Sequence, residues 1–156
     1  MRALIQRVDY AKVFVEGVLE GSAGAGFLVL LGVADTDDET SAELLAEKVV
    51  HIRIFEDDTG KMNRSILDVS GDMLIISQFT LLADTGRGRR PSFNVACEPV
   101  RAERLYRYFV DVVRGRGIET STGSFGKMMK VELVNNGPVT ILLDTDNYTG
   151  KNHDRH

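Results

Sequence analysis

The sequence has few of the residue types that carry metal, redox or acid–base chemistry. Its 156 residues include one cysteine and three histidines. The single cysteine, Cys97, cannot form an internal disulfide, and the scattered histidines do not have the spacing of a zinc site. The chain also has no P-loop and no dinucleotide-binding fingerprint. We therefore expect no disulfide, no metal and no cofactor.

The sequence also lacks the hydrophobic segments of exported and membrane proteins. The first residues, MRALIQRVDYAKV, carry charges at positions 2, 7, 9 and 12, which argues against a signal peptide. The longest apolar stretch, GAGFLVLLGVA at 24–34, is too short to cross a bilayer and suits a buried strand. We expect a cytoplasmic protein without a membrane partner.

The net charge of −4 and the pI near 5.4 argue against indiscriminate binding of nucleic acid, which needs a broad positive field. Local basic patches are compatible with this charge. One is the glycine-rich segment GRGRRP at 86–91, which contains Arg87, Arg89 and Arg90. This segment is either a solvated turn or a phosphate contact, and the same alternatives hold for a helix face with Arg104, Arg107 and Arg114.

Local patterns predict seven or eight strands and two helices. Strands are expected at 2–8, 26–33, 51–55, 72–81, 127–135 and 138–144, with a hairpin at 12–21 that turns near Glu16 and Gly17. Helices are expected at 36–50, where Thr36 and Glu39 have capping-box spacing, and at 99–115, between a proline and glycines.

The helices do not alternate with the strands, so the pattern indicates a layered α+β fold rather than a doubly wound parallel sheet. Two helices cover only part of so much sheet, and we expect a second sheet or a partner subunit to cover the rest. Residues 1–145 are predicted to form a single domain. Residues 146–156 are predicted to form a polar, poorly ordered C-terminal tail.

The candidate side chains for catalysis lie in SQFTL at 77–81. On a strand, Ser77 and Phe79 would face one side, and Gln78 and Thr80 the other. A serine or threonine nucleophile needs a base, usually a histidine. Only His51 lies within the region expected to be ordered, so the residues do not favour a Ser/His/Asp triad.

A second unusual segment, NNGPVT at 135–140, is predicted to form a rigid corner before a strand. Proline has no N–H and a fixed φ, while glycine and asparagine adopt the backbone angles of turns. Backbone N–H groups can stabilise an oxyanion, and carbonyls can hold an ammonium group. The chain is therefore compatible with an active site in which backbone groups act on a substrate that is already reactive.

Together these segments resemble the D-aminoacyl-tRNA deacylase family, also called D-tyrosyl-tRNA deacylases. SQFTL and NNGPVT carry the resemblance. Further matching segments occur in the family's order and spacing: RALIQRV at 2–8, RIFEDDTGKMNRS at 53–65, GRRPSF at 88–93, LYRYF at 105–109 and FGKMMKVELVN at 125–135. The resemblance covers nearly the whole chain.

The resemblance implies a layered β/β/α sandwich with mostly antiparallel sheets, two main helices and a homodimeric assembly. It also implies hydrolysis of the ester that joins a D-amino acid, or glycine, to tRNA. In the family a cis Gly-Pro peptide reaches into the partner subunit's site, and the matching residues here are Gly137 and Pro138. Their carbonyls would accept hydrogen bonds from the substrate's α-ammonium, so that the side chain of an L-amino acid would meet the protein wall.

The resemblance further assigns the ester or oxyanion contact to the backbone N–H of Phe79, with Ser77, Gln78 and Thr80 around it. Either Thr80 acts as a nucleophile, or the 2′-hydroxyl of the terminal adenosine helps to activate water. The shortage of bases favours the second alternative.

Other positions match the family with different roles. Arg7 matches an arginine that holds the Gly-Pro carbonyls, and Met129 matches a pocket wall. Lys127 and Met128 lie in a variable part of the motif, and we assign them no role. The three arginines at 87–90 either contact tRNA phosphates or are solvated surface side chains.

Two other functions remain open. The first is a non-catalytic module of the same fold that binds tRNA or another nucleic acid. The second is a general serine or threonine esterase that would depend on Ser77 or Thr80 and be indifferent to tRNA.

Overall fold

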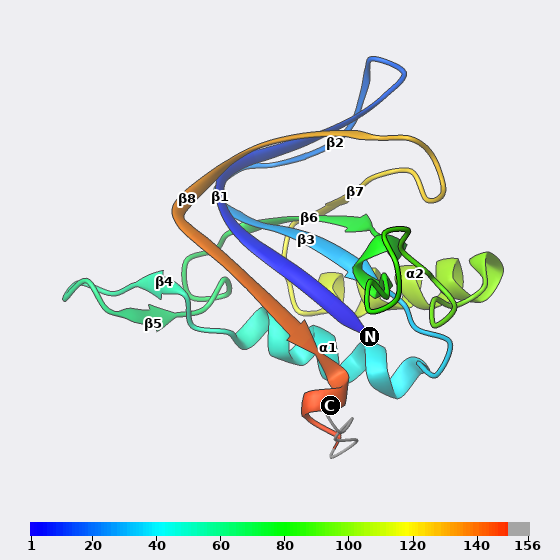
Figure 1. Cartoon of the computed structure of the whole chain (residues 1–156). Coiled ribbons are helices and arrows are strands. Elements are labelled where there is room, and N and C mark those ends of the chain that lie inside the picture. The colour runs from blue at the N-terminus through cyan, green and yellow to red at the C-terminus, as the bar shows by residue number, and fades with distance from the viewer. Residues whose placement is uncertain (150–156) are drawn as a thin grey trace.

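A six-stranded mixed sheet forms the centre of the computed structural model, which describes residues 1–149 (Figure 1). Its strands are β1 (Arg2–Val15), β2 (Val18–Ala23), β3 (Gly26–Gly32), β6 (Asp72–Ser77), β7 (Thr120–Thr122) and β8 (Lys130–Asp144). β1 is antiparallel to β2, β3 and β8, whereas β3, β6 and β7 are parallel to one another. A separate antiparallel hairpin of β4 (Phe55–Glu56) and β5 (Met62–Arg64) projects from one side (Figure 1).

The sheet folds over itself because β1 changes partners along its length. Residues 2–8 of β1 pair with β3, and residues 11–15 pair with β2. Figure 1 shows β1 and β8 bending together near their middles. The bend encloses a small core between two sheet layers, made of Val8, Ala11, Val13, Ala23, Leu28, Leu74 and Ile76. The predicted second layer of sheet is thus part of the same chain.

A larger core lies between the sheet and two helices, α1 (Glu39–His51) and α2 (Pro99–Gly115). In α2, Leu105, Phe109 and Val113 are fully buried and, at a spacing of four residues, lie along one face of the helix. The carboxylate of Glu98 accepts hydrogen bonds from the first N–H groups of this helix. The α+β class, the β/β/α layers and both main helices are therefore confirmed.

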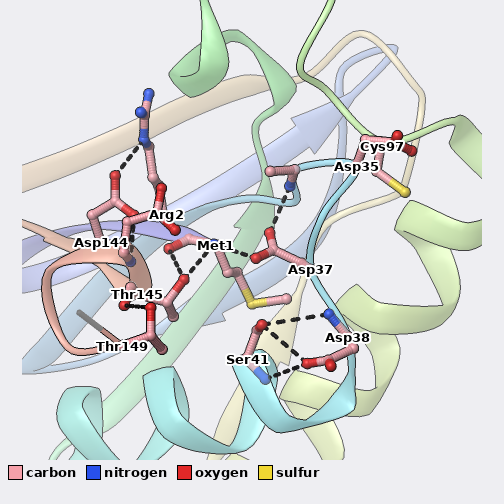
Figure 2. Close-up of polar contacts among 12 residues, drawn as sticks. Met1, Arg2, Asp35, Asp37, Asp38, Ser41, Cys97, Asp144, Thr145 and Thr149 are labelled. Atoms are coloured by element: carbon pink, nitrogen blue, oxygen red, sulfur yellow. Dashed lines mark hydrogen bonds and ion pairs between the residues drawn. The ribbon is translucent and has the colours of Figure 1, made fainter. Parts of the chain in front are cut away.

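The start of α1 differs from the prediction. The capping box is formed by Asp38 and Ser41, whose backbone N–H donates to the Asp38 carboxylate at 2.9 Å (Figure 2). Thr36 and Glu39 do not form it, because Glu39 is the first residue of the helix and its carboxylate pairs with Arg104 of α2. The Glu39 carboxylate therefore binds the other helix and does not cap α1.

Four predicted strands have different bounds in the structure. The strand expected at 51–55 is wrong at its start, since residue 51 ends α1 and β4 begins at residue 55. The strand expected at 72–81 ends at Ser77, and Phe79–Leu82 form a 3-10 turn, η1. The strands expected at 127–135 and 138–144 form one strand, β8, which is interrupted by a bulge. The hairpin turn at Glu16 and Gly17 is confirmed, with φ of 50° and 79°.

The two ends of the described chain are joined by polar contacts (Figure 2). The Met1 ammonium donates to the Asp37 carboxylate and to the Thr145 hydroxyl, both at 2.6 Å. The Arg2 guanidinium donates to Asp144 at 2.7 Å. A short turn, η2 (Thr145–Asn147), follows β8. Of the tail predicted at 146–156, residues 150–156 lie outside the described residues.

Candidate active site

A pocket with a volume of about 600 Å³ lies beside the end of β6. One wall consists of Ser77, Gln78, Phe79 and Thr80. The segments 96–97 and 125–129 also line it, and the latter includes Met129. The structure therefore brings together five of the residues that the sequence indicates. It also places Lys127 and Met128, to which we assigned no role, in the pocket lining.

Two of the wall residues, Phe79 and Thr80, belong to a turn rather than to a strand. β6 ends at Ser77, which pairs with Leu31 of β3, and the Gln78 N–H then donates to the Leu31 carbonyl at 2.8 Å. The alternation of sides expected for residues 77–80 on a strand is therefore wrong. Instead the Gln78 side-chain amide donates to the Thr80 hydroxyl, and 57% of the Phe79 surface is exposed.

Contacts from outside the turn hold η1 in place. The Arg2 guanidinium donates to the Leu81 carbonyl at 3.0 Å while it also binds Asp144. Gly32 lies so close that a Cβ atom there would be 3.1 Å from the Gln78 carbonyl oxygen. The backbone of η1 is thus held from β1 and β3. Such fixed backbone groups are suited to stabilise charge that develops in a reaction.

The pocket lining contains no histidine and no carboxylate. His51 lies at the end of α1 and faces Glu47 at 3.3 Å. Cys97 lines the pocket, but burial raises the pKa of its thiol above the usual range, so the thiol stays protonated at neutral pH. The pocket lining thus offers Ser77 and Thr80 no histidine, carboxylate or thiolate as a general base.

The residues 1–149 contain no group of three or more histidine, cysteine, aspartate or glutamate side chains that could hold a metal ion. In the same part of the chain, no helix is both long enough and apolar enough to span a membrane.

The Gly137-Pro138 peptide is cis and lies in the bulge of β8. Gln6 pairs with Thr140 and Val8 pairs with Asn135, so four residues of β8 lie opposite a single residue of β1. The Asn135 side chain closes this bulge by accepting a hydrogen bond from the Val139 N–H at 2.8 Å. Asparagine at this position therefore has a structural role in the corner.

The single residue opposite the bulge is Arg7, which is buried. Its Nε donates to the Asn136 carbonyl at 3.0 Å, and its Nη1 donates to the Ile54 carbonyl at 2.6 Å. Gly137 has φ of 136°, and a Cβ atom there would lie 2.7 Å from Val139 Cγ2 and 3.1 Å from Arg7 Nη2. Both the backbone angle and the close packing require glycine.

The structure does not bring all the predicted site residues together within one chain. Gly137 and Pro138 are exposed, and neither they nor Arg7 line the pocket beside η1. The site residues thus form two groups, the pocket and the Gly-Pro corner.

The predicted phosphate contacts lie in a closed surface loop. Asp84 and Ser92 exchange two backbone hydrogen bonds of 2.8 and 2.9 Å, and residues 85–91 between them form what we call the arginine loop. Its three arginines are exposed, and none of the ion pairs found within residues 1–149 includes them. On α2, by contrast, Arg104 pairs with Glu39 and Arg107 pairs with Glu103.

Two residues that contact η1 were missed by sequence reasoning. Arg2 contacts the carbonyl of Leu81, and the ring of Phe93 meets the ring of Phe79 edge to face, with 5.0 Å between the centroids. Phe93 had a signal, since it ends the matching segment GRRPSF. Arg2 had none, because nothing in the pattern of the first strand shows that residue 81 lies beside it.

Comparisons with known proteins show which family the chain belongs to. Residues 4–144 match the family model described as D-Tyr-tRNA(Tyr) deacylase. The chain is 54% identical over 145 residues to the D-aminoacyl-tRNA deacylase of Jannaschia sp. (strain CCS1), covering 93% of this chain and 99% of the relative. It is 51% identical over 150 residues to the D-aminoacyl-tRNA deacylase of Thermus aquaticus, covering 96% and 99%.

Solved structures with the same fold include one described as c-Myc DNA Unwinding Element Binding Protein. It has a TM-score of 0.87 and 36% identity, covering 92% of this chain and 98% of the other. A probable eukaryotic D-amino acid tRNA deacylase, 20% identical, has a TM-score of 0.77 with coverage of 91% and 97%, and shows the shared fold. Because the family model and the relatives match nearly end to end, the chain belongs to the D-Tyr-tRNA(Tyr) deacylase family.

Proposed function

We propose that the protein hydrolyses the ester bond between a D-amino acid, or glycine, and tRNA, and leaves L-aminoacyl-tRNA intact. The family and the names of the curated relatives support this activity. The observation that carries the mechanism is a pocket whose wall is the fixed turn at η1 and whose lining has no histidine or carboxylate. Catalysis then depends on backbone groups and on the substrate.

The backbone N–H of Phe79 is the proposed donor to the oxyanion. Phe79 is the first residue of η1, and the first N–H groups of a helical turn have no partner within it. An N–H group held in this way can stabilise the negative charge that develops on the carbonyl oxygen of the ester as water attacks the carbonyl carbon. Ser77, Gln78 and Thr80 shape the pocket around that carbon.

The attacking water loses its proton with help from the 2′-hydroxyl of the terminal adenosine rather than from a protein base. The bond from the carbonyl carbon to the ribose oxygen then breaks, and that oxygen takes up a proton. The products are the free amino acid and tRNA with an intact ribose. No metal or cofactor takes part in this scheme, and the reaction occurs in the cytoplasm, where tRNA is used.

The Gly-Pro corner of a second subunit completes the site in this proposal. Gly137 and Pro138 are exposed and lie outside the pocket of their own chain. β8 also carries exposed apolar side chains, namely Val131, Val134 and Leu142, at 37%, 41% and 54% exposure. Exposed apolar groups on a long strand favour contact with another copy, and a two-fold dimer would present both corners equally.

The corner selects chirality through backbone carbonyls. Carbonyl oxygens at Gly137 and Pro138 would accept hydrogen bonds from the α-ammonium of the substrate. With the ammonium and the ester carbon both fixed, the side chain of an L-amino acid is directed into the protein wall. Glycine has no side chain to clash, so it is a substrate as well.

The rival proposal is a module that binds nucleic acid and does no chemistry. One observation favours it: a 36% identical protein of the same fold is described as a DNA unwinding element binding protein. The decisive experiment measures hydrolysis of D-tyrosyl-tRNA, L-tyrosyl-tRNA and glycyl-tRNA at limiting protein with EDTA present. Hydrolysis of the D and glycyl esters alone supports the deacylase. Binding of tRNA without hydrolysis of any ester supports the rival.

A further inference from the structure

The ring of Phe93 contacts the residue that carries the proposed oxyanion donor. The rings of Phe79 and Phe93 lie edge to face, with an interplanar angle of 67° and 5.0 Å between centroids. This is a favourable geometry for two aromatic rings. Since 57% of the Phe79 surface is exposed, the Phe93 ring restrains a side chain that solvent would otherwise leave free to move.

The backbone of Phe93 is anchored on both sides. On one side, Ser92 exchanges its two backbone hydrogen bonds with Asp84. On the other, the Ala96 N–H donates to the Phe93 carbonyl at 3.0 Å, and the Cys97 N–H donates to the Val33 carbonyl at 3.0 Å. The segment 92–97 therefore has a defined path, and residues 96 and 97 at its end line the pocket.

The same segment continues directly into the arginine loop. The Asp84–Ser92 bridge that anchors Phe93 also closes residues 85–91. The loop presents three arginines that have no carboxylate partner within residues 1–149, so their charges are free to meet phosphates. A displacement of the arginine loop would therefore be transmitted to Phe93 through the Asp84–Ser92 hydrogen bonds and the peptide bond between Ser92 and Phe93.

We propose that Phe93 is a positioning residue that couples tRNA phosphates bound by the arginine loop to the orientation of the Phe79 backbone N–H. This inference rests on the proposed function and extends it. The loop then does more than add affinity, because binding of the tRNA body also restrains the exposed Phe79 residue at the start of the turn. An ester that lacks the tRNA body gains no such restraint.

The kinetic test replaces Phe93 with alanine. Phe93→Ala lowers kcat on D-tyrosyl-tRNA by about ten- to a hundredfold, because a small displacement of a catalytic group is costly, and it changes KM by less than about twofold. Phe93→Tyr keeps the ring and retains kcat. If the alanine variant does not fold, Phe93→Leu replaces it in the test, because leucine also lacks the aromatic ring. The control is Phe55→Leu, which removes one ring of the stacked Phe27/Phe55 pair away from the pocket and keeps kcat. An unchanged kcat in folded Phe93→Ala overturns the proposal.

A second measurement does not depend on activity. The backbone amide signal of Phe79 is followed by NMR while tRNA without its 3′-terminal CCA is added, so that the pocket stays empty. The signal shifts in the wild type and stays in place in Phe93→Ala, although the affinity for this tRNA changes by less than about twofold. Equal shifts in both proteins overturn the coupling. If the wild type hydrolyses no ester, the proposed function fails, and this titration still decides whether loop and turn are coupled.

Discussion

The guanidinium of Arg7 donates a hydrogen bond of 3.0 Å to the carbonyl of Asn136, the residue before the Gly-Pro pair. It also donates to the Ile54 carbonyl at 2.6 Å. Arg7 therefore ties the bulge of β8 to the segment that leads into the β4–β5 hairpin. The family resemblance pointed to the Gly-Pro carbonyls as the partners of this arginine, whereas the bonded carbonyl belongs to residue 136. That carbonyl precedes the pair, so it is not one of the two carbonyls that we propose as acceptors for the substrate's ammonium group.

Replacing Arg7 with lysine is expected to weaken the corner. Lysine cannot reach two carbonyls in the fixed geometry of a guanidinium, so a buried carbonyl loses its partner at a cost of about 1–3 kcal/mol. Urea denaturation measures this loss of unfolding free energy, and kcat/KM on D-tyrosyl-tRNA falls with it. Arg53→Lys, at an exposed arginine, is the control and leaves both quantities unchanged. Equal stability of the two variants would show that Arg7 does not hold the corner.

Thr80→Ala is expected to reduce kcat by less than about tenfold, because the pocket lining has no histidine or carboxylate to activate the hydroxyl. The change removes the hydroxyl that accepts from Gln78 and the methyl group beside it. Single-turnover hydrolysis of D-tyrosyl-tRNA measures the effect, and Ser77→Ala is tested beside it. Loss of all turnover in a folded Thr80→Ala protein that still binds tRNA would make Thr80 the nucleophile and remove the water mechanism.

The three arginines of the arginine loop are expected to contribute to tRNA affinity in a way that depends on salt. Replacing Arg87, Arg89 and Arg90 with alanine should weaken binding and lower the slope of log K against log salt by about 0.7–0.9 for each phosphate that the loop no longer neutralises. Arg104→Ala is the matched control, since Arg104 is already paired with Glu39. An unchanged salt slope in the triple variant would remove the loop from the tRNA interface.

Tyr106 gives the fold a predictable response to alkaline pH. Its hydroxyl donates to the Ile75 carbonyl at 2.7 Å, and burial raises its pKa to about 12. The folded state therefore favours the neutral phenol, so its contribution is complete below pH 10 and is lost as pH rises from about 10 to 12.

The test is denaturation of the wild type and of Tyr106→Phe between neutral pH and pH 12. At neutral pH the variant is less stable by about 0.5–1.5 kcal/mol, because the hydrogen bond to the Ile75 carbonyl is missing. The difference in stability between the two proteins then shrinks or reverses above pH 10. Other tyrosines titrate equally in both proteins and cancel. A constant difference across this range would show that Tyr106 does not titrate as described.

The sequence alone predicted features that depend on local residues. Helix α2 begins and ends as expected because Pro99 and the Glu98 cap lie in the sequence itself. The turn at Glu16 and Gly17 follows from the residue types that adopt positive φ. Ser77 and Thr80 were candidates because of their hydroxyl groups, and the family resemblance gave roles to Phe79 and Gln78; all four line the pocket.

Features that depend on distant partners could not be predicted in this way. The strand predicted over DMLIISQFTL runs to residue 81, but β6 ends at Ser77 and the chain turns into η1, which Arg2 and Gly32 contact from other strands. Glu39 was expected to cap α1, but Arg104 of the other helix binds it. The contact of Phe93 with Phe79 likewise joins residues on either side of a long loop.

The central claim is that Gly137 and Pro138 act in the site of the partner subunit, and mixed dimers test it most directly. One subunit carries Gly137→Ala, which places a Cβ 2.7 Å from Val139 Cγ2. The other carries Ala96→Trp, which fills the pocket. As a control, Gly117→Ala changes a glycine that also has positive φ, 84°, but has no close neighbour, and it keeps activity.

Each variant alone is expected to be inactive on D-tyrosyl-tRNA. If the corner acts across the dimer, refolding the two variants together in equal amounts restores about a quarter of wild-type activity, since half of the dimers are mixed and each has one complete site. If the corner acts within its own chain, no subunit in the mixture has both an intact pocket and an intact corner. Absence of any restored activity in mixed dimers would therefore contradict the account.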